Sequence, residues 1–242
     1  MPVGPAPRPL VVVTGAGRGV GFATALALVR THRAQVIAVS RDVSAWNAVK
    51  EEGITPLTAD VATEEGRATV VRAVDGRPLA GLINNAGLGT QRKLVDMSDD
   101  EWHKVLDVTL TGTFRMMRAM LPHMQKRGRG AIVNNSSVLG WRAQKEQAHY
   151  AAAKAGVMAL TRCAGLEAAE HGVRINAVAP SIALHAFLKK SASEELLAQL
   201  TGREAFGRAA EVWEVANVMM FLASDYASYL VGEVISVSSQ HA

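Results

Sequence analysis

Short apolar runs alternate along the chain with longer stretches in which apolar residues recur at helical spacing. The apolar runs are rich in branched side chains and do not alternate with polar positions, which is typical of strands buried on both faces of a sheet. We predict seven such strands, at residues 10–14, 35–39, 55–59, 81–85, 131–135, 174–178 and 233–237.

The stretches between these strands predict helices at residues 19–32, 64–74, 98–125 and 149–172. Ser98 and Glu101 have the spacing of a capping box at the start of the third helix. Regular alternation of strands and helices implies a parallel sheet with helices on both faces. There is no tandem repeat and no linker, so we expect one doubly wound α/β domain over residues 10–242.

Two segments depart from this alternation. Residues 1–9 are rich in proline and lack the apolar core of a signal peptide, so we expect a flexible arm. Residues 182–208 predict one or two extra helices between the sixth strand and the last long helix. Ligands of open α/β sheets bind beyond the carboxyl ends of the strands, which makes this insertion a candidate substrate lid.

The composition is that of an ordinary globular protein, with 49% apolar and 20% charged residues among 242. No apolar run reaches the length of a membrane span, and we expect no nucleic-acid partner and no metal. The net charge is +4, and five basic residues fall close together. They form either a solvated surface or a site for an anionic ligand such as a CoA ester, and are Arg115, Arg118, Lys126, Arg127 and Arg129.

Cys163 is the only cysteine, so the chain cannot form an internal disulfide. This favours a reducing, cytoplasmic location. Its apolar helical surroundings predict a small core residue.

A glycine-rich loop, TGAGRGVG at residues 14–21, lies directly between the first strand and the first helix. Glycines at such a turn let the backbone approach a pyrophosphate, and the helix N-terminus supplies free N–H groups. The position of the loop, rather than the glycines alone, predicts a dinucleotide site.

The second strand ends at Ser40 and Arg41, where an acidic residue would bind the ribose hydroxyls of NAD(H). Arg41 and Arg18 offer planar, charge-assisted contacts to a 2′-phosphate, so we predict a preference for NADP(H). Asp42 would occupy the acidic position if the strand ended two residues later, and NAD(H) therefore stays open.

The stretch NNSSVLGWRAQKEQAHYAAAK, residues 134–154, carries the candidate chemistry. Tyr150 and Lys154 are four residues apart on a predicted helix and so share a face, and Ser137 ends the preceding strand. A nearby ammonium would lower the pKa of the tyrosine, which could then exchange a proton with a carbonyl oxygen during hydride transfer. Ser137 could hold that oxygen, and Lys154 could also hold the nicotinamide ribose.

Residues 8–237, which carry these motifs, resemble the short-chain dehydrogenase/reductase family. The resemblance rests on the glycine loop, on Asp60-Val61, on residues 84–87 (NNAG), on Ser137, Tyr150 and Lys154, and on residues 174–180 (RINAVAP). It implies a Rossmann-type fold, conversion between a ketone and a secondary alcohol, and a homotetramer or homodimer. The cofactor contacts that it implies are Gly15, Arg18, Gly19, Val20, Gly21, Ser40, Arg41, Asp60, Val61, Asn85, Ala86, Gly87, Tyr150, Lys154, Pro180 and Ile182.

Three positions depart from the family pattern. Thr109 replaces an asparagine that positions a water in the proton relay, and we expect Thr109→Asn to leave turnover unchanged or raise it. Ser181 replaces a glycine, and its side chain would crowd the nicotinamide; His185 replaces a threonine that contacts the cofactor. The ending, residues 236–240, also lacks the usual Asp-Gly-Gly.

The substrate is predicted less directly, because its contacts come from the variable insertion at 182–208. The runs NNSSVLGWRAQ, HYAAAKAGVMALTRC and PSIALHAFL resemble reductases that degrade steroid rings and act on CoA thioesters. The first half of the chain resembles 3-oxoacyl-thioester reductases of fatty-acid synthesis. A third alternative, motivated by the substitutions at 109, 181 and 185, is a cofactor-binding protein without catalysis.

Overall fold

The central sheet fixes the position of every candidate site residue. In the computed structural model, which describes residues 8–184 and 194–239, seven parallel strands have the order β3-β2-β1-β4-β5-β6-β9. Each predicted strand is present, and the bounds are β1 (Leu10–Thr14), β2 (Gln35–Ser40), β3 (Ile54–Thr58), β4 (Leu79–Asn84), β5 (Gly130–Asn135), β6 (Val173–Pro180) and β9 (Val234–Val237). The strand order reverses between β1 and β4, which is where open α/β sheets bind their ligands.

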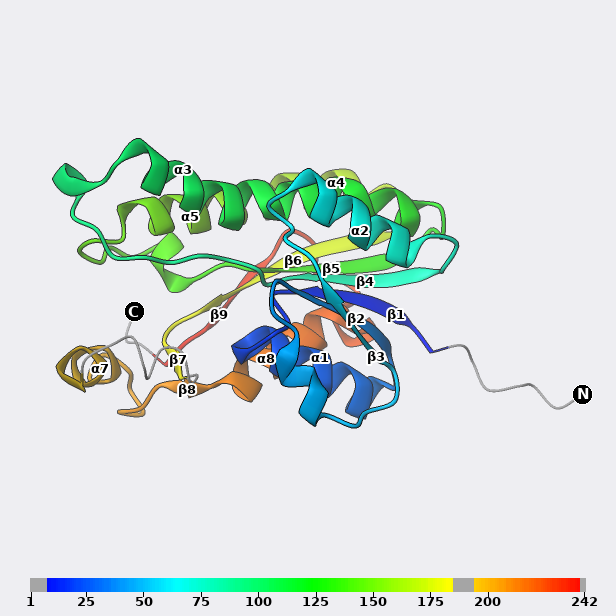
Figure 1. Ribbon diagram of the computed structural model, residues 1–242, viewed down its shortest axis with the longest axis horizontal. Coiled ribbons are helices and arrows are strands. Elements are labelled where there is room, and N and C mark those ends of the chain that lie inside the picture. The colour runs from blue at the N-terminus through cyan, green and yellow to red at the C-terminus, as the bar shows by residue number, and fades with distance from the viewer. Residues whose placement is uncertain (1–7, 185–193, 240–242) are drawn as a thin grey trace, which may run out of the picture.

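Helices cover both faces of the sheet, as the alternating pattern predicts (Figure 1). One layer holds α2 (Glu64–Val74), α3 (Asp99–Leu106), α4 (Gly112–Gln125) and α5 (Ala148–Ala169), and the other holds α1 (Gly19–His32) and α8 (Val212–Ala223). Each layer buries its own apolar cluster against the sheet. The doubly wound Rossmann-type fold is therefore confirmed.

The predicted helix at 98–125 is continuous but changes its winding. Ser98 and Glu101 form the predicted capping box at the start of α3. A short π-helical turn, Asp107–Thr111, joins α3 to α4. Thr109 lies buried in this turn, and π-turns inside helices are frequent at functional sites.

Two predictions of burial are wrong. Strand β3 is an edge strand, so most of its side chains are exposed or half-exposed rather than buried. Cys163 is exposed on α5, because the apolar stretch around it is long enough to place residues on the solvent face of the helix as well as on the sheet.

The described part of the 182–208 insertion lies beyond the carboxyl ends of the strands (Figure 1). It contains β7 (Ala183–Leu184), which pairs with β8 (Ala210–Glu211), and the helix α7 (Glu194–Thr201). Residues 185–193 of the predicted lid and residues 1–7 of the predicted arm lie outside the described residues. The arm and the lid both stay predictions.

The segment after α7 is hydrogen-bonded to the segment that follows β9. The buried carboxylate of Glu204 accepts hydrogen bonds from the backbone N–H and the hydroxyl of Ser239, at 3.1 and 2.8 Å. Within the described residues, no helix is long and apolar enough to cross a membrane.

Candidate active site

Ser137, Tyr150 and Lys154 come together at the carboxyl edge of the sheet. Ser137 follows β5, and the other two residues lie one turn apart near the start of α5. The side chain of Ser137 interacts with the hydroxyl of Tyr150, and this interaction acts to lower the pKa of the phenol. Lys154 is buried, and its ammonium nitrogen lies 5.5 Å from the centroid of the Tyr150 ring. The spacing of four residues therefore places both side chains on one face of the helix, as predicted.

The join between β5 and α5 fixes this arrangement. The hydroxyl of Ser136 donates to the backbone carbonyl of Lys154 at 2.8 Å. The hydroxyl of Ser137 accepts from the backbone N–H of Leu139 at 3.2 Å, which caps the short turn after the strand. The catalytic candidates are thus held by neighbouring backbone rather than by loops free to move.

Burial, and not the charge of the Lys154 ammonium, has the largest effect on the pKa values of Tyr150 and Lys154. It raises the pKa of Tyr150 to about 12, although the hydrogen bond to Ser137 opposes this shift. Burial also lowers the pKa of Lys154 to about 7. The expected lowering of the tyrosine pKa by Lys154 is wrong for this structure, because the ammonium faces the ring and donates to the carbonyl of Asn135 at 2.5 Å.

Asn135 links this pair to the glycine loop. Its side-chain N–H donates to the Asn85 carboxamide oxygen at 2.8 Å. The Asn85 amide donates in turn to the carbonyls of Thr14 and Gly15, at 3.2 and 3.1 Å. Asn85 thus holds the loop from the end of β4.

The glycine loop packs so closely that side chains would not fit. A Cβ on Gly17 would lie 2.1 Å from the backbone oxygen of Asp42, and one on Gly21 would lie 2.4 Å from the Asn85 side chain. Gly15 and Gly19 have φ angles of +64° and +59°, in the left-handed region that favours glycine. This cradle, followed directly by α1 with Val20 in its first turn, fits the pyrophosphate of a dinucleotide.

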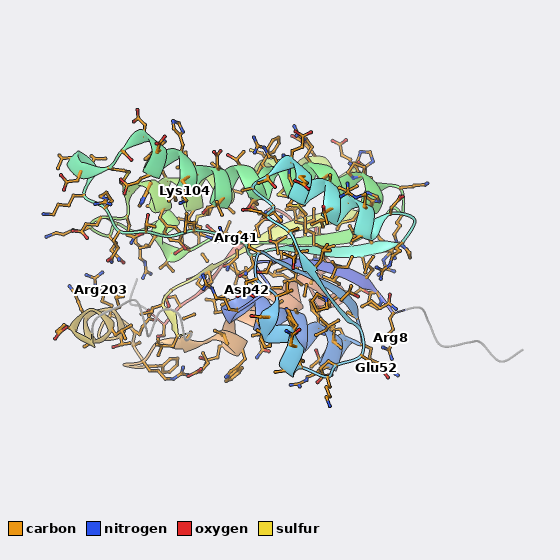
Figure 2. The ribbon with its side chains drawn as sticks, in the orientation of Figure 1. Arg8, Arg41, Asp42, Glu52, Lys104 and Arg203 are labelled. Atoms are coloured by element: carbon orange, nitrogen blue, oxygen red, sulfur yellow. The ribbon has the colours of Figure 1, made fainter. Side chains whose placement is uncertain are left out.

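At the end of β2, Arg41 and Asp42 are both exposed at the carboxyl edge, as Figure 2 shows, whereas Arg8 and Glu52 lie at the opposite end. The carboxylate of Asp42 accepts from the backbone N–H of Ser44 at 2.9 Å. Hydrogen bonds from Ser44 lower the pKa of Asp42, with a smaller contribution from the charge of Arg18. The Asp42 carboxylate is therefore bonded to the first residue of the short turn that follows, Ser44–Ala48.

That turn carries a residue which sequence reasoning missed. The indole N–H of Trp46 donates to the carbonyl of Ala16, in the glycine loop, at 3.0 Å. The Trp46 ring is buried and stacks on Phe22 of α1, with the ring centroids 4.2 Å apart. No motif marks this position, because an aromatic residue after a strand is usually read as core.

The adenine side of the predicted site is formed by the turn before α2. The carboxylate of Asp60 accepts from the backbone N–H of Ala62 at 2.9 Å, and Val61 beside it is buried.

The other predicted cofactor contacts follow β6 and β4. Pro180 ends β6, and Ile182 accepts a hydrogen bond from Ala210 through its backbone carbonyl. These predicted contacts all lie at the carboxyl edge, as do Ala86 and Gly87 after β4.

Two buried oxygens at the ends of β5 and β6 lack hydrogen-bond partners in the part of the chain that the structure describes. They are the carboxamide oxygen of Asn135 and the hydroxyl of Ser181. A buried polar atom without a partner costs about 1–3 kcal/mol, so a ligand that pairs with these oxygens would be stabilised there. His185, the third departure, lies outside the described residues.

The five basic residues that are close together in the sequence lie in two places: Arg115 and Arg118 are on α4, and the other three follow it. Lys126, Arg127 and Arg129 precede β5, at the amino edge of the sheet and away from Ser137. Arg127 donates to the Leu79 carbonyl and Arg129 pairs with Asp225, so the suggestion that 126–129 holds a CoA phosphate lacks support. Among the described residues, no group of three or more acidic, histidine or cysteine side chains is arranged to hold a metal.

The comparisons with known proteins show the family of the chain. A family model described as enoyl-(acyl carrier protein) reductase matches residues 15–239. The chain belongs to the short-chain dehydrogenase/reductase family and is an oxidoreductase that uses a nicotinamide cofactor.

Two curated relatives stand at different distances. The (5R,7aS)-5-hydroxy-7a-methyl-1-oxo-2,3,5,6,7,7a-hexahydro-1H-indene-carboxyl-CoA reductase of Mycobacterium tuberculosis is 52% identical, over 96% of this chain and 92% of that protein. The 3-oxoacyl-[acyl-carrier-protein] reductase FabG of Escherichia coli is 32% identical, over 95% of each chain. The relatives therefore include both groups that the sequence resembles, a reductase of a cyclic CoA thioester and a 3-oxoacyl-thioester reductase.

Two solved structures share the fold closely. A short-chain dehydrogenase from Mycobacterium smegmatis has 46% identity and a TM-score of 0.82, over 97% of this chain and 93% of that one. A protein described as a NAD(P) dependent gluconate 5-dehydrogenase from Beutenbergia cavernae, with bound NADP, has 34% identity and a TM-score of 0.89, over 96% and 95%.

Proposed function

We propose that this protein is an NADP(H)-preferring reductase that interconverts a ketone and a secondary alcohol on a cyclic, steroid-derived CoA thioester. The observation that carries the chemistry is the placement of Tyr150 next to Ser137 and to the buried Lys154 at the carboxyl edge of the sheet. The substrate class is supported by the 52% identity to the hexahydroindene-carboxyl-CoA reductase.

The residues divide the work as follows. The nicotinamide cofactor, when bound, supplies or accepts the hydride. Tyr150 donates its proton to the substrate oxygen, and Ser137 holds that oxygen by a hydrogen bond. Lys154 supplies positive charge beside the Tyr150 phenol. Together with Asn135, it borders the side of the site proposed to hold the ribose. Because burial holds the pKa of Tyr150 near 12, the phenol is protonated at neutral pH, which suits reduction.

The preference for NADP(H) rests on the geometry at the end of β2. Asp42 is engaged by Ser44, so the acid that would repel a 2′-phosphate is turned to a structural role. Arg41 is exposed beside it, and the charge of Arg18 reaches the same place. The FabG relatives and the NADP-bound neighbour belong to the same family, which agrees with this preference.

Reduction of a 3-oxoacyl thioester is the second candidate, supported by identities of 32–34% to FabG proteins. One assay separates the two. The absorbance of NADPH and NADH is followed with a bicyclic hexahydroindenone CoA thioester, with 3-oxoacyl-CoA esters and with simple cyclic ketones. We expect the bicyclic thioester to have the highest kcat/KM. Faster turnover of 3-oxoacyl-CoA would favour the second candidate.

The same assay tests a role without catalysis. Tyr150→Phe serves as the control for adventitious activity, since it removes only the phenolic oxygen. Tight cofactor binding without turnover on any ketone or alcohol in the panel would overturn the proposed enzyme and favour a non-catalytic cofactor-binding protein.

We also propose that the protein is a cytoplasmic homotetramer. Large apolar side chains are exposed on two separate surfaces, Phe114 and Leu166 on α4 and α5, and Trp213 and Phe221 on α8. Apolar surface of this kind marks association sites. Light scattering coupled to gel filtration should give about four times the chain mass of 25.7 kDa; a mass of two chains would indicate the homodimer, and a mass of one would overturn the proposal.

A further inference from the structure

The segment from Gly87, the last residue of the NNAG motif, to Arg92 runs directly past Tyr150. We call it the 87–92 loop. A Cβ on Gly89 would lie 3.3 Å from two carbons of the Tyr150 ring, so the backbone of this loop packs closely on the ring and a side chain there would press against it. The position of the loop therefore defines one wall around the phenol.

Thr109 holds the first part of this loop. Its hydroxyl accepts from the backbone N–H of Leu88 at 3.0 Å and donates to the backbone carbonyl of the same residue at 3.3 Å. A threonine hydroxyl has one proton to donate, and here it is directed at Leu88. Thr109 reaches the loop because the π-helical turn Asp107–Thr111 carries it, and it is 1% exposed.

His149 holds the middle of the loop. Its Nε2 is hydrogen-bonded to the hydroxyl of Thr90 at 2.8 Å, and its side chain is fully buried next to Tyr150 in sequence. Burial lowers the pKa of His149, which favours the neutral ring. The Nδ1 of His149 has no hydrogen-bond partner within the described chain, and such a buried polar atom lowers the stability of the fold. The bond from Nε2 to Thr90 is therefore the contact that His149 contributes to the loop.

The far end of the loop is fastened as well. The backbone N–H of Arg92 donates to the carbonyl of Glu146 at 2.9 Å, just before α5. The Arg92 guanidinium also donates two hydrogen bonds to Glu101 on α3, at 2.9 and 2.6 Å. These surface contacts add less than the two buried ones.

We infer that Thr109 and His149 are positioning residues, which hold the 87–92 loop against Tyr150 and so fix the space in which the substrate carbonyl meets the phenol. This inference rests on the proposed reductase function for its kinetic consequence. It gives Thr109 a role different from the asparagine of the family pattern: the hydroxyl fastens a loop and does not spend its proton on a relay water.

The first experiment needs no substrate. Amide hydrogen exchange of the cofactor-free protein is compared between wild type, Thr109→Val and Thr90→Val, which remove one hydroxyl each at nearly constant volume. Loss of one such hydrogen bond costs about 0.5–1.5 kcal/mol, so exchange in the 87–92 loop should accelerate by roughly 2- to 10-fold in Thr90→Val, and by more in Thr109→Val, whose hydroxyl makes two bonds to Leu88. Thr109→Ser should restore slow exchange.

Thr113→Val is the matched control. Thr113 is also a buried threonine on the same helical segment, but its hydroxyl donates to the backbone carbonyl of Thr109 and not to the loop. Exchange in the 87–92 loop should remain at the wild-type rate in this variant. Unchanged loop exchange in both Thr109→Val and Thr90→Val would overturn the inference.

Kinetics then separates positioning from general loss of stability. Thr109→Val, Thr90→Val and His149→Phe should lower kcat/KM for the ketone by roughly 3- to 10-fold while the KM for NADPH stays constant. Thr90→Val combined with His149→Phe should cost no more than either change alone, because both remove the same hydrogen bond. Fully additive losses in that pair would contradict the role of His149. A wild-type protein inactive on the whole panel would refute the proposed function, and the exchange data would still decide whether the loop is held in this way.

Discussion

The ammonium of Lys154 faces the ring of Tyr150 at 5.5 Å and hydrogen-bonds the carbonyl of Asn135. Lys154 is buried and Tyr150 is half-buried, and burial moves their pKa values in opposite senses, up to about 12 for the phenol and down to about 7 for the amine. Each charge is thereby disfavoured. The pair consequently holds a proton on the tyrosine at neutral pH and has a lysine that titrates within the physiological range.

The stability of the folded protein should depend on pH through Lys154. The lysine pKa falls from 10.5 in the unfolded chain to about 7 in the folded protein, so between these values the unfolded chain binds more protons. The free energy of unfolding should therefore rise with pH across this window, by up to about 1.4 kcal/mol per unit from this group. Tyr150, with its raised pKa, opposes the rise only above about pH 10.

Urea unfolding at pH 7, 8 and 9 measures this slope, with Lys154→Met as the comparison. The variant replaces the amine by an apolar chain of similar length, so its stability should change less with pH than that of the wild type. Parallel pH profiles for the two proteins would show that Lys154 is charged in the folded state at neutral pH.

Removal of the Tyr150 hydroxyl should abolish most of the turnover while leaving the cofactor site intact. General acid catalysis contributes roughly 10²- to 10⁴-fold, so kcat of Tyr150→Phe should fall by that factor. Ser137→Ala should also lower kcat, and the double variant should be little worse than Tyr150→Phe because the two hydroxyls act as a unit. Fluorescence titration of NADPH should give wild-type affinity in all three; weakened binding would mean that the hydroxyls hold the cofactor instead.

Much of this site could be predicted from local sequence. Periodicity located the strands and helices, and in a parallel sheet the carboxyl ends meet at one edge, so Ser137 and the glycine loop had to lie at the same edge of the sheet. The spacing of Tyr150 and Lys154 placed them on one helix face. These inferences need only the periods of regular structure and the direction of the strands.

The remaining features depend on contacts between segments far apart in the chain. The bond from Trp46 to Ala16 spans 30 residues, and the bond between Thr90 and His149 spans 59. Neither pair has a local pattern, and the burial of each becomes known only when the loops are placed. The burial of the Tyr150 phenol likewise decides the sign of its own pKa shift, which the ammonium alone would have lowered.

The choice of cofactor should follow Arg41 rather than Asp42. A charge-assisted hydrogen bond contributes about 1.5–3 kcal/mol, so Arg41→Ala should raise the KM for NADPH by roughly 10- to 100-fold and change the KM for NADH little. Asp42→Asn keeps an oxygen for the N–H of Ser44 and should leave both values near those of wild type. A selective rise in the KM for NADH in Asp42→Asn would identify Asp42 as a ligand of the ribose, and the preference would then have to be reassigned.

Trp46 should act on cofactor affinity without touching the chemistry. Trp46→Phe can keep the stacking on Phe22 but removes the N–H that holds the Ala16 carbonyl in the glycine loop. The loss of one buried hydrogen bond, at about 1–3 kcal/mol shared between folding and binding, should weaken NADPH binding by roughly 3- to 10-fold and lower Tm by a few degrees. The value of kcat at saturating cofactor should stay at the wild-type level. Tyr229→Phe is the control, since it also removes one polar group from an aromatic side chain and that tyrosine is 99% exposed. NADPH affinity equal to wild type in Trp46→Phe would show that Asn85 and the glycines hold the loop without help from this side.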